Sequence, residues 1–301
     1  MSDSDLKLAY YFALLHTLIT GLSFLFTKTA LKFASPMDVL AYRFTASLIA
    51  LMVPIMLKRV HLDYAGKNLL QVCSLGLLYP IAFFFFQTFG LVYATSSEGG
   101  ILQSVTPIFT MLLAAVFLKE RTTGYQKLSI LLSVAGVIYI FIMKGAGLDI
   151  TEVLGISLLL LSSIASAGYH VLTRITLRRF SITEVSFIMT LLGFLFFNTA
   201  AIIGHVVKGT LNQFLAPLQN LEFAISILYL GILSSLVTSL LNNYILKKLE
   251  AAKVSVFGNL RTVVTIVAGV YFLKERLYLY HIIGSLMIIL GVLGTNYAGR
   301  R

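Results

Sequence analysis

A five-residue string occurs twice in this chain, and the repetition constrains the architecture more than any other feature. Residues 117–121 and 272–276 both read Phe-Leu-Lys-Glu-Arg, at an offset of 155 residues, and each copy follows a long apolar run. An internal repeat of this kind means that one structural unit has been duplicated. The sequence therefore predicts two equivalent units, at residues 1–147 and 148–301.

The apolar composition indicates a membrane environment for both units. Hydrophobic residues make up 58% of the chain and charged residues 12%, with a mean hydropathy of +0.92, so the chain is far more apolar than an average soluble domain. A helix needs about 20 apolar residues to cross about 30 Å of hydrocarbon. Ten runs are long enough, and we therefore expect an all-α integral membrane protein with ten transmembrane helices. The runs lie at residues 8–30, 39–57, 69–89, 98–118, 124–143, 153–174, 183–206, 223–245, 251–273 and 278–297.

Basic residues are distributed unequally between the two sides of these runs. Fifteen lie in segments on the side of the N-terminus and six on the other side, while Arg43 and Arg261 lie within runs. Cytoplasmic loops of membrane proteins are enriched in Lys and Arg, so we expect both termini in the cytoplasm and the protein in the cytoplasmic (inner) membrane. The net charge of +11 then lies mainly at the surface of the lipid bilayer, and we expect no nucleic-acid partner.

An odd number of helices per unit has a topological consequence. With five helices in the first unit, the second unit enters the membrane from the opposite side, which makes two inverted five-helix repeats. Inverted repeats recur in secondary transporters, where substrate binds near the midplane between the halves and access alternates between the two sides. Duplicated channels and inert scaffolds are the alternatives, and we favour transport.

Several short motifs recur at matching places in the two units. The first unit contains Tyr93–Ser97 and Thr106-Pro107, and the second contains Asn242–Tyr244 and Leu249–Lys253, each set followed by Leu-Lys-Glu-Arg. With these motifs the chain resembles the EamA-type ten-helix permeases of the drug/metabolite transporter superfamily over nearly all its length. The resemblance implies a metabolite exporter. Where the family usually repeats the proline in the second unit, this chain has Arg261-Thr262, which leaves open whether the ninth helix bends as the fourth does.

Two arginines lie inside the expected helices. Arg261 is about ten residues, or about 15 Å, into the ninth run, and we expect it to face the bundle interior because snorkelling from that depth is hard. Arg43 is nearer the start of the second run, so its guanidinium is placed either at the outer interface or in the interior. No Asp or Glu falls in the middle of any run. This pattern disfavours a cation exporter and favours a substrate that bears a carboxylate or a phosphate.

Polar side chains repeat along one face of several expected helices. In the first and sixth runs, which align at an offset of 146 residues, a spacing of four, three and four residues places them on one helical face. Such a stripe either joins helices through hydrogen bonds or lines a wet cavity, and both interpretations stay open here. The two stripes consist of His16, Thr20, Ser23 and Thr27, and of Ser162, Ser166, Tyr169 and Thr173.

Two carboxamides, Gln87 and Asn242, occupy equivalent positions in the two units. An unsatisfied amide in hydrocarbon costs several kcal/mol, so each either clamps a neighbouring helix or faces a cavity. Tyr79 either stacks on a substrate or packs in the core. We predict a central cavity between helices one, three, four, six, eight and nine. The candidate substrate-binding residues are His16, Thr20, Arg43, Tyr79, Gln87, Gln103, Ser166, Tyr169, Thr238, Asn242 and Arg261.

Nothing in the sequence indicates catalysis. The chain lacks a phosphate-binding loop, a cluster of metal ligands and a catalytic triad, so we expect no enzyme activity, no metal site and no cofactor. The leading hypothesis is export of amino-acid-like or other carboxylate-bearing metabolites by alternating access. The alternative is an importer or exchanger of phosphorylated or nucleotide-linked metabolites, for which a second deep cation would be the discriminating feature. A non-transport membrane scaffold is the alternative of another class.

Three further groups of residues are expected to serve structure alone. Glu120 and Glu275, in the repeated strings, are expected to pair with neighbouring basic residues in short turns. Small residues in the fifth and tenth runs, such as Gly136 and Gly291, allow close helix packing, and a homodimer through them is left open. Residues 83–86, all phenylalanine, are expected to face lipid or the core.

Overall fold

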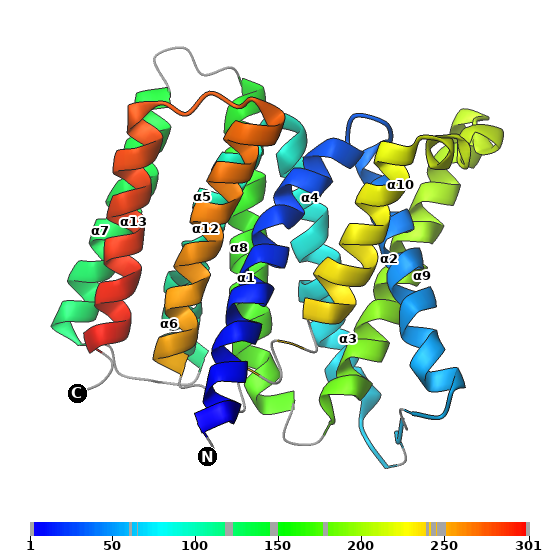
Figure 1. Cartoon of the computed structure of the whole chain (residues 1–301), viewed down its shortest axis with the longest axis horizontal. Coiled ribbons are helices and arrows are strands. Elements are labelled where there is room, and N and C mark those ends of the chain that lie inside the picture. Colours follow the sequence, from blue (N-terminus) through cyan, green and yellow to red (C-terminus); the bar gives the residue numbers. More distant parts are fainter. Residues whose placement is uncertain are drawn as a thin grey trace.

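The protein is a bundle of helices that run roughly alongside one another (Figure 1). The structure is a computed structural model, and it describes residues 3–59, 62–64, 66–117, 123–144, 150–176, 180–238, 241, 245 and 251–298. Within these ranges every regular element is a helix. The first helix begins and the last helix ends at the lower edge of Figure 1. We call this edge the terminus end and the opposite edge the distal end.

Helical segments coincide, in whole or in part, with all ten apolar runs of the sequence. Seven described segments are long and apolar enough to cross a membrane, and the count of ten crossings stays a prediction. The elements of the first unit are α1 (Asp3–Ala30), α2 (Pro36–Met56), α3 (Leu69–Gly76), η1 (Leu77–Ala82), α4 (Phe83–Tyr93), α5 (Ser96–Gln103), α6 (Thr106–Phe117) and α7 (Gly124–Lys144). Those of the second are α8 (Ile150–Thr176), α9 (Ile182–Lys208), η3 (Leu211–Gln213), η4 (Ala216–Gln219), α10 (Leu221–Leu228), η5 (Tyr229–Val237), α12 (Ala251–Leu273) and α13 (Leu279–Ala298).

Two helices of the first unit are interrupted in mid-bundle. The third run breaks at Tyr79, whose backbone is extended (φ −143°, ψ 117°), next to Pro80. The fourth run breaks between α5 and α6, just before Pro107. Proline lacks the N–H that would bond to the carbonyl oxygen of Gln103, and the hydroxyl of Thr106 donates to that oxygen instead, at 2.8 Å. No proline interrupts α12, which is one continuous helix, so the ninth run does not break as the fourth does.

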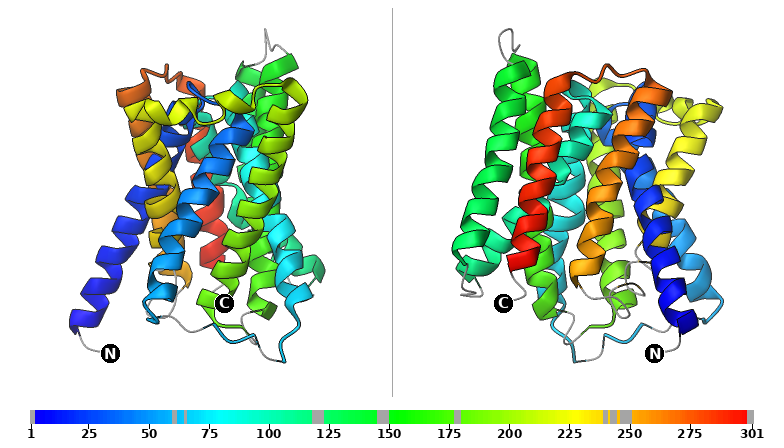
Figure 2. Two further views of the ribbon diagram at one scale, coloured as in Figure 1. Left: turned by 90° about the vertical axis from the view of Figure 1, so that its right-hand side faces the viewer. Right: turned by 60° about the vertical axis from the view of Figure 1, so that its left-hand side comes forward.

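The helix contacts follow the equivalence of the two units. α2 packs against α9, α5 against α12, and α7 against α13, and each pair joins elements at equivalent positions. The contact of α1 with α12 likewise has its counterpart in the contact of α8 with α6. Figure 1 and the right-hand view of Figure 2 show α7 and α13 side by side at one edge of the bundle. In Figure 1, α2 and α9 lie toward the other edge, and most of the remaining helices lie between.

Small residues allow α7 and α13 to approach closely. A Cβ added at Gly136 would lie 2.8 Å from the carbonyl oxygen of Gly284, and one at Gly291 would lie 2.5 Å from that of Ser129. Across the same contact the hydroxyl of Ser133 donates to a backbone carbonyl of α13, at 3.0 Å. The small residues of the fifth and tenth runs therefore pack against each other within one chain.

Acidic residues at the starts of α2 and α9 connect α2, and the segment that follows it, to α9 at both ends. At the distal end, a carboxylate oxygen of Asp38 lies 3.1 Å from Nε2 of His205, near the end of α9. At the terminus end, Glu184 lies 2.7 Å from Nζ of Lys67, in the segment that follows α2. Asp38 and Glu184 are equivalent at the offset of 146 residues. The two equivalent acids thus join the two units at opposite ends.

The second copy of the repeated string ends α12, and its glutamate contacts the other unit. Glu275 accepts hydrogen bonds from the backbone N–H groups of Ser96 and Ser97, at the start of α5. These partners are 179 and 178 residues away in the sequence, so the expectation of local pairing with basic neighbours is wrong for Glu275. Glu120, in the first copy, lies outside the described residues.

Candidate functional site

A cavity of about 280 Å³ lies in the middle of the bundle. It is lined by residues of α1, α2, η1, α4, α5, α6, α8, α9, η5 and α12. It extends toward the terminus end, because its lining includes Ser186, near the start of α9, and His170, near the end of α8. His170 is exposed, so the cavity lining reaches the surface of the bundle toward that end.

Ten of the eleven candidate substrate-binding residues line this cavity. Asn242 is the eleventh and lies outside the described residues. The ten are His16, Thr20, Arg43, Tyr79, Gln87, Gln103, Ser166, Tyr169, Thr238 and Arg261. One space thus brings together residues from both units, and substrate binding by each of them stays a prediction.

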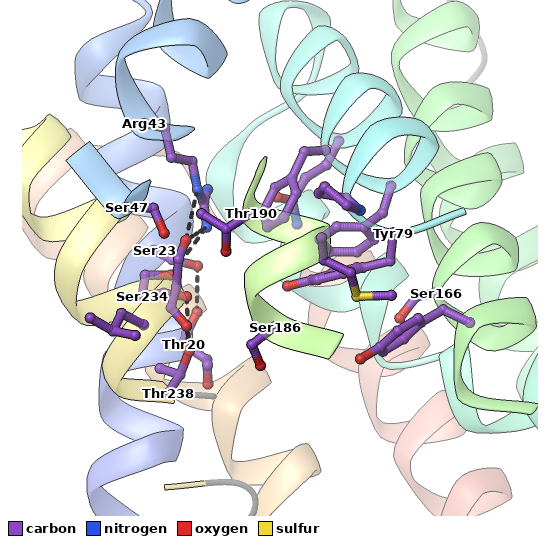
Figure 3. Close-up of a pocket in the computed structure, with 18 of the residues that line it drawn as sticks. Thr20, Ser23, Arg43, Ser47, Tyr79, Ser166, Ser186, Thr190, Ser234 and Thr238 are labelled. Carbon is purple, nitrogen blue, oxygen red and sulfur yellow. Dashed lines mark hydrogen bonds between the residues drawn. The ribbon is translucent and has the colours of Figure 1, made fainter. Parts of the chain in front are cut away.

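Arg43 is buried in the cavity wall. Only 3% of its surface is exposed, and its guanidinium carbon lies 4.0 Å from the centroid of the Phe84 ring. Its Nη2 lies 3.4 Å from the hydroxyl oxygens of Ser234 and Ser235, and Figure 3 shows Arg43 extending from α2 toward Ser234. The structure therefore places Arg43 in the interior and not at the membrane interface, because α2 packs against η5 as well as α9.

Arg261 lines the same cavity from α12. Its guanidinium forms no hydrogen bond or ion pair with any residue in the described part of the chain. It is near enough to His16 and to Tyr79 to interact with both electrostatically. Tyr79 also lies within such range of Arg43. The tyrosine is thus close to both cations of the site.

The charged side chains in the described lining of the cavity are all positive. Two arginines belong to its lining, and no aspartate or glutamate does among the residues that the structure describes. Charge interactions are much stronger in a protein interior than in water. The described part of the lining therefore favours negatively charged groups over positively charged ones.

Aromatic rings form one wall of the cavity. The rings of Tyr79 and Tyr169 stack with centroids 4.8 Å apart, and Phe83 and Phe84 pack against Tyr79 at 5.0 and 5.1 Å. Phe84 belongs to a buried hydrophobic cluster against which Phe83 packs, as expected of core residues, and both phenylalanines also line the cavity. The break at Tyr79 changes the direction of the residues that follow it, which regular helical spacing does not reveal. Such a wall suits a flat or apolar part of a ligand.

Hydroxyl groups on the cavity wall bond within their own helices. Thr20 donates to the carbonyl oxygen of His16 at 2.8 Å, and Ser23 to that of Thr20 at 2.7 Å. Thr238 donates to the carbonyl oxygen of Ser234 at 2.9 Å. These hydroxyls do not join helices, and their free lone pairs can accept from water or from a ligand hydroxyl. Thr20, Ser23 and Thr238 therefore act as polar lining.

Two amides of the first unit have different surroundings. Nε2 of Gln103 donates to the hydroxyl of Ser162 at 2.7 Å, which ties α5 to α8. Gln87 is buried at the cavity and forms no hydrogen bond with another residue of the described ranges. A buried amide needs partners, which water or substrate in the cavity can supply. Gln103 is thus a clamp, and Gln87 is the amide available to a ligand.

The structure adds α2 and α9, the helices of the second and seventh apolar runs, to the predicted cavity lining. Ser47 follows Arg43 by one turn of α2, and Ser186 and Thr190 are four residues apart on α9. The one-face spacing used for the other helices would have found this pair. Ser234 also lines the cavity. Its face could not be assigned from the sequence because η5 has π-helical geometry, which shifts the spacing of side chains.

Comparison with known proteins decides the family. The EamA-like transporter family matches this chain over residues 7–142 and again over residues 153–297. The chain belongs to this family. A similar protein is the uncharacterized transporter YcxC of Bacillus subtilis, 47% identical over 288 residues that cover 96% of this chain and 92% of the relative. An uncharacterized transporter of Archaeoglobus fulgidus is 30% identical over 275 residues, covering 90% of this chain and 92% of the relative.

A solved crystal structure shares the fold of this EamA family member. It aligns with a TM-score of 0.64 at 16% identity and covers 97% of this chain and 99% of its own. Family membership and the apolar spans make the protein a multi-pass membrane transporter. The names of the relatives give no substrate, so the substrate class has to be inferred from the cavity.

Proposed function

We propose that this EamA family member transports compact organic anions across the cytoplasmic membrane by alternating access. The supporting observation is that Arg43 and Arg261 share one cavity, whose described lining contains no acidic residue. Even low insertion scales assign a cost of about 2.5–3.5 kcal/mol to an arginine at the centre of a membrane helix. A negatively charged substrate offsets that cost through charge-assisted hydrogen bonds.

Cations and zwitterions fit this cavity less well than anions. Both arginines repel a cation, and the described lining offers no carboxylate to neutralise it. An amino acid would place its carboxylate near an arginine but leave its ammonium group to hydroxyls and aromatic rings. We therefore favour carboxylates without a free ammonium group over amino acids.

Phosphorylated metabolites are the second candidate class, and the position of Arg43 favours them. A second deep cation is the feature expected of a phosphate-binding transporter, and the buried Arg43 provides it. The cavity volume of about 280 Å³ lies just below the range of about 300–1,000 Å³ for small-molecule sites. Small phosphate esters and dicarboxylates therefore fit better than nucleotide-linked metabolites.

Alternating access is supported by the relation between the two units. The family matches each unit separately, equivalent helices pack against one another, and the equivalent acids Asp38 and Glu184 make contacts at opposite ends. These observations support an inverted repeat with its boundary near residue 147. With both termini in the cytoplasm, the cavity faces the cytoplasm. Export is the proposed direction, by resemblance to EamA-type permeases.

Transport by purified protein in proteoliposomes tests this function. Uptake and efflux are measured for labelled monocarboxylates, dicarboxylates, phosphate esters, amino acids, neutral sugars and organic cations, with and without a pH gradient. We expect at least one anion to be transported faster than its neutral analogue and no organic cation to be transported. The double variant R43Q/R261Q, reconstituted at the same density, is the matched control. Transport without any preference for anions would contradict the proposal.

A further inference from the structure

At the distal end, the carboxylate of Glu275 joins the second unit to the first. Oε1 accepts a hydrogen bond from the backbone N–H of Ser96 at 2.6 Å. Oε2 accepts one from the backbone N–H of Ser97 at 3.0 Å and one from the Ser97 hydroxyl at 2.6 Å. All three bonds lie at the N-terminus of α5, where the helix dipole favours a negative charge. The second unit thus supplies an anion at the start of a helix of the first, in addition to the local capping box of Thr95 and Glu98.

The turn after α12 directs this carboxylate toward α5. Lys274 has a left-handed backbone conformation (φ 56°), which is uncommon for a residue other than glycine. The N–H of Glu275 donates to the carbonyl oxygen of Gly269 at 3.2 Å, so the chain folds back over the end of α12. A Cβ at Gly269 would lie 2.7 Å from the Ser97 hydroxyl and would collide with the Glu275 carboxylate. The turn and the glycine together position this one side chain.

Helices α5 and α12 pack closely between the cavity and Glu275. Gln103 and Arg261 line the cavity; Gln103 lies about 10 Å along α5 from its start, and Arg261 about 18 Å along α12 from its end. In between, the hydroxyl of Thr262 donates to the carbonyl oxygen of Gly100 at 3.3 Å. A Cβ at Gly100 would lie only 2.7 Å from a side chain of α12. The interface of these helices therefore separates the cavity from the distal end, with Glu275 at its outer edge.

During a conformational change, the hydrogen bonds of Glu275 to α5 can be replaced by hydrogen bonds to water. The α2–α9 pair is fastened at both ends by Asp38 and Glu184, and α7 and α13 pack through glycines. Glu275 joins the two units on the distal side of the cavity, at the edge of the α5–α12 interface, through hydrogen bonds that water can replace. Alternating access requires a contact between the halves that is made in one state and broken in the other.

We propose that Glu275 is a latch that holds the distal end closed, and that this end opens only when the carboxylate leaves α5. The inference rests on the proposed alternating access. Charge-assisted hydrogen bonds are about twice as strong as neutral ones. Glu275→Gln keeps the shape of the side chain and removes its charge, so it shifts the population toward the state that is open at the distal end.

Side-specific cysteine labelling tests the latch without any substrate. In a Cys73→Ser background, Ser23→Cys places one thiol in the cavity. A membrane-impermeant maleimide is added to one face or the other of sealed, oriented vesicles. With Glu275 intact we expect fast labelling from the terminus side and slow labelling from the distal side. Glu275→Gln should raise the distal rate about fivefold or more, in proportion to the population shift, and lower the rate from the terminus side.

Further variants separate a latch from general damage to the fold. Gly269→Ala keeps the Glu275 carboxylate, but the added methyl group occupies the space that the carboxylate needs. This variant should also raise the distal labelling rate. Glu275→Asp keeps the charge and should restore slow distal labelling in part. Glu222→Gln is the matched control, because its exposed carboxylate pairs only loosely with Lys32, at 3.8 Å. This control should label like the parent protein from both sides.

Folded Glu275→Gln and Gly269→Ala proteins with the parental distal rate would overturn the latch. If Glu275→Gln does not fold, Ser97→Ala removes one of the three bonds and must still give a faster distal rate. A lowered melting temperature with unchanged labelling on both sides would show a purely structural cap. Because labelling needs no substrate, a negative result in the substrate panel leaves the latch intact. A failed latch likewise leaves the preference for anions intact.

Discussion

The guanidinium carbon of Arg43 lies 4.0 Å from the centroid of the Phe84 ring, so this cation rests on an aromatic face inside the bundle. Such a contact stabilises a cation by about 0.5–2 kcal/mol. The distances of 3.4 Å from Nη2 to the hydroxyls of Ser234 and Ser235 are longer than the usual value of about 2.9 Å. Phe84 thus holds the Arg43 guanidinium in place, and the N–H groups of the guanidinium remain available to a stronger acceptor.

Replacement of Arg43 separates the effect of charge from that of planarity. Arg43→Lys keeps the cation but loses the planar fork, and we expect slower anion transport. Arg43→Gln should reduce anion transport about 10- to 100-fold, the equivalent of about 1.5–3 kcal/mol for a charged hydrogen bond. Initial rates in proteoliposomes measure both effects. Arg59→Gln, at an exposed arginine, is the control. If the Arg43→Gln protein were as active as this control, Arg43 would not bind the substrate.

Arg261 is expected to set the preference among substrates. A structural role, in which it bonds carbonyls released by a broken helix, is not seen among the described residues, because the Arg261 guanidinium forms no hydrogen bond with any of them. Arg261→Gln should therefore lose the preference for anionic over neutral analogues, and Arg261→Lys should retain part of it. Relative transport rates across the substrate panel measure this preference. A stable Arg261→Gln protein that transports the same substrates in the same order would end the hypothesis.

The sequence predicted the helices because each requires only a run of apolar residues, and every run coincides with helical structure. It could not decide between the two environments of Arg43, since a side chain near a helix end faces the cavity or the interface according to its neighbours. Those neighbours, η5 and α9, come from the other unit. Glu275 is a similar case, because its partners lie 178 and 179 residues away. Local spacing carries no information about such contacts.

Irregular backbone explains most of the remaining differences. The candidate residues on regular helices, such as His16 and Thr20, do line the cavity. The sequence did not identify Phe84 and Ser234 as cavity-lining residues. The break at Tyr79 changes the direction of the residues that follow it, and π-helical geometry changes the direction of those within η5. A period of 3.6 residues applies only while the helix is regular.

The close contact of α7 with α13 is expected to contribute strongly to stability. Gly291→Ala would place a Cβ 2.5 Å from the carbonyl oxygen of Ser129, and such overpacking costs about 1–3 kcal/mol. Gly204→Ala in α9, where a Cβ meets nothing within 4 Å, should instead stabilise the helix by about 0.5–1 kcal/mol. Thermal unfolding in detergent measures the two shifts, which should have opposite signs. Equal melting temperatures for the two variants would contradict this packing.

Gln87 and Gln103 should respond differently to the same substitution. Gln103→Leu breaks the 2.7 Å bond to Ser162 and should lower the free energy of unfolding by about 1–3 kcal/mol. Gln87→Leu breaks no bond to a described residue, so it should leave stability unchanged and reduce transport. Melting temperatures and transport rates of the two variants separate these roles. A Gln87→Leu protein with parental transport, or one that fails to fold, would show that this amide does not serve the substrate.

The central claim is that Arg43 and Arg261 together select a negatively charged substrate. The most direct measurement compares transport of one anion with that of its neutral analogue, by the parent protein and by R43Q/R261Q reconstituted at equal density. For the parent we predict an anion-to-neutral ratio above about 10, the equivalent of about 1.4 kcal/mol. In the double variant the ratio should fall toward one, with the neutral analogue transported no more slowly than before. A double variant that keeps the parental ratio would contradict selection by these two arginines.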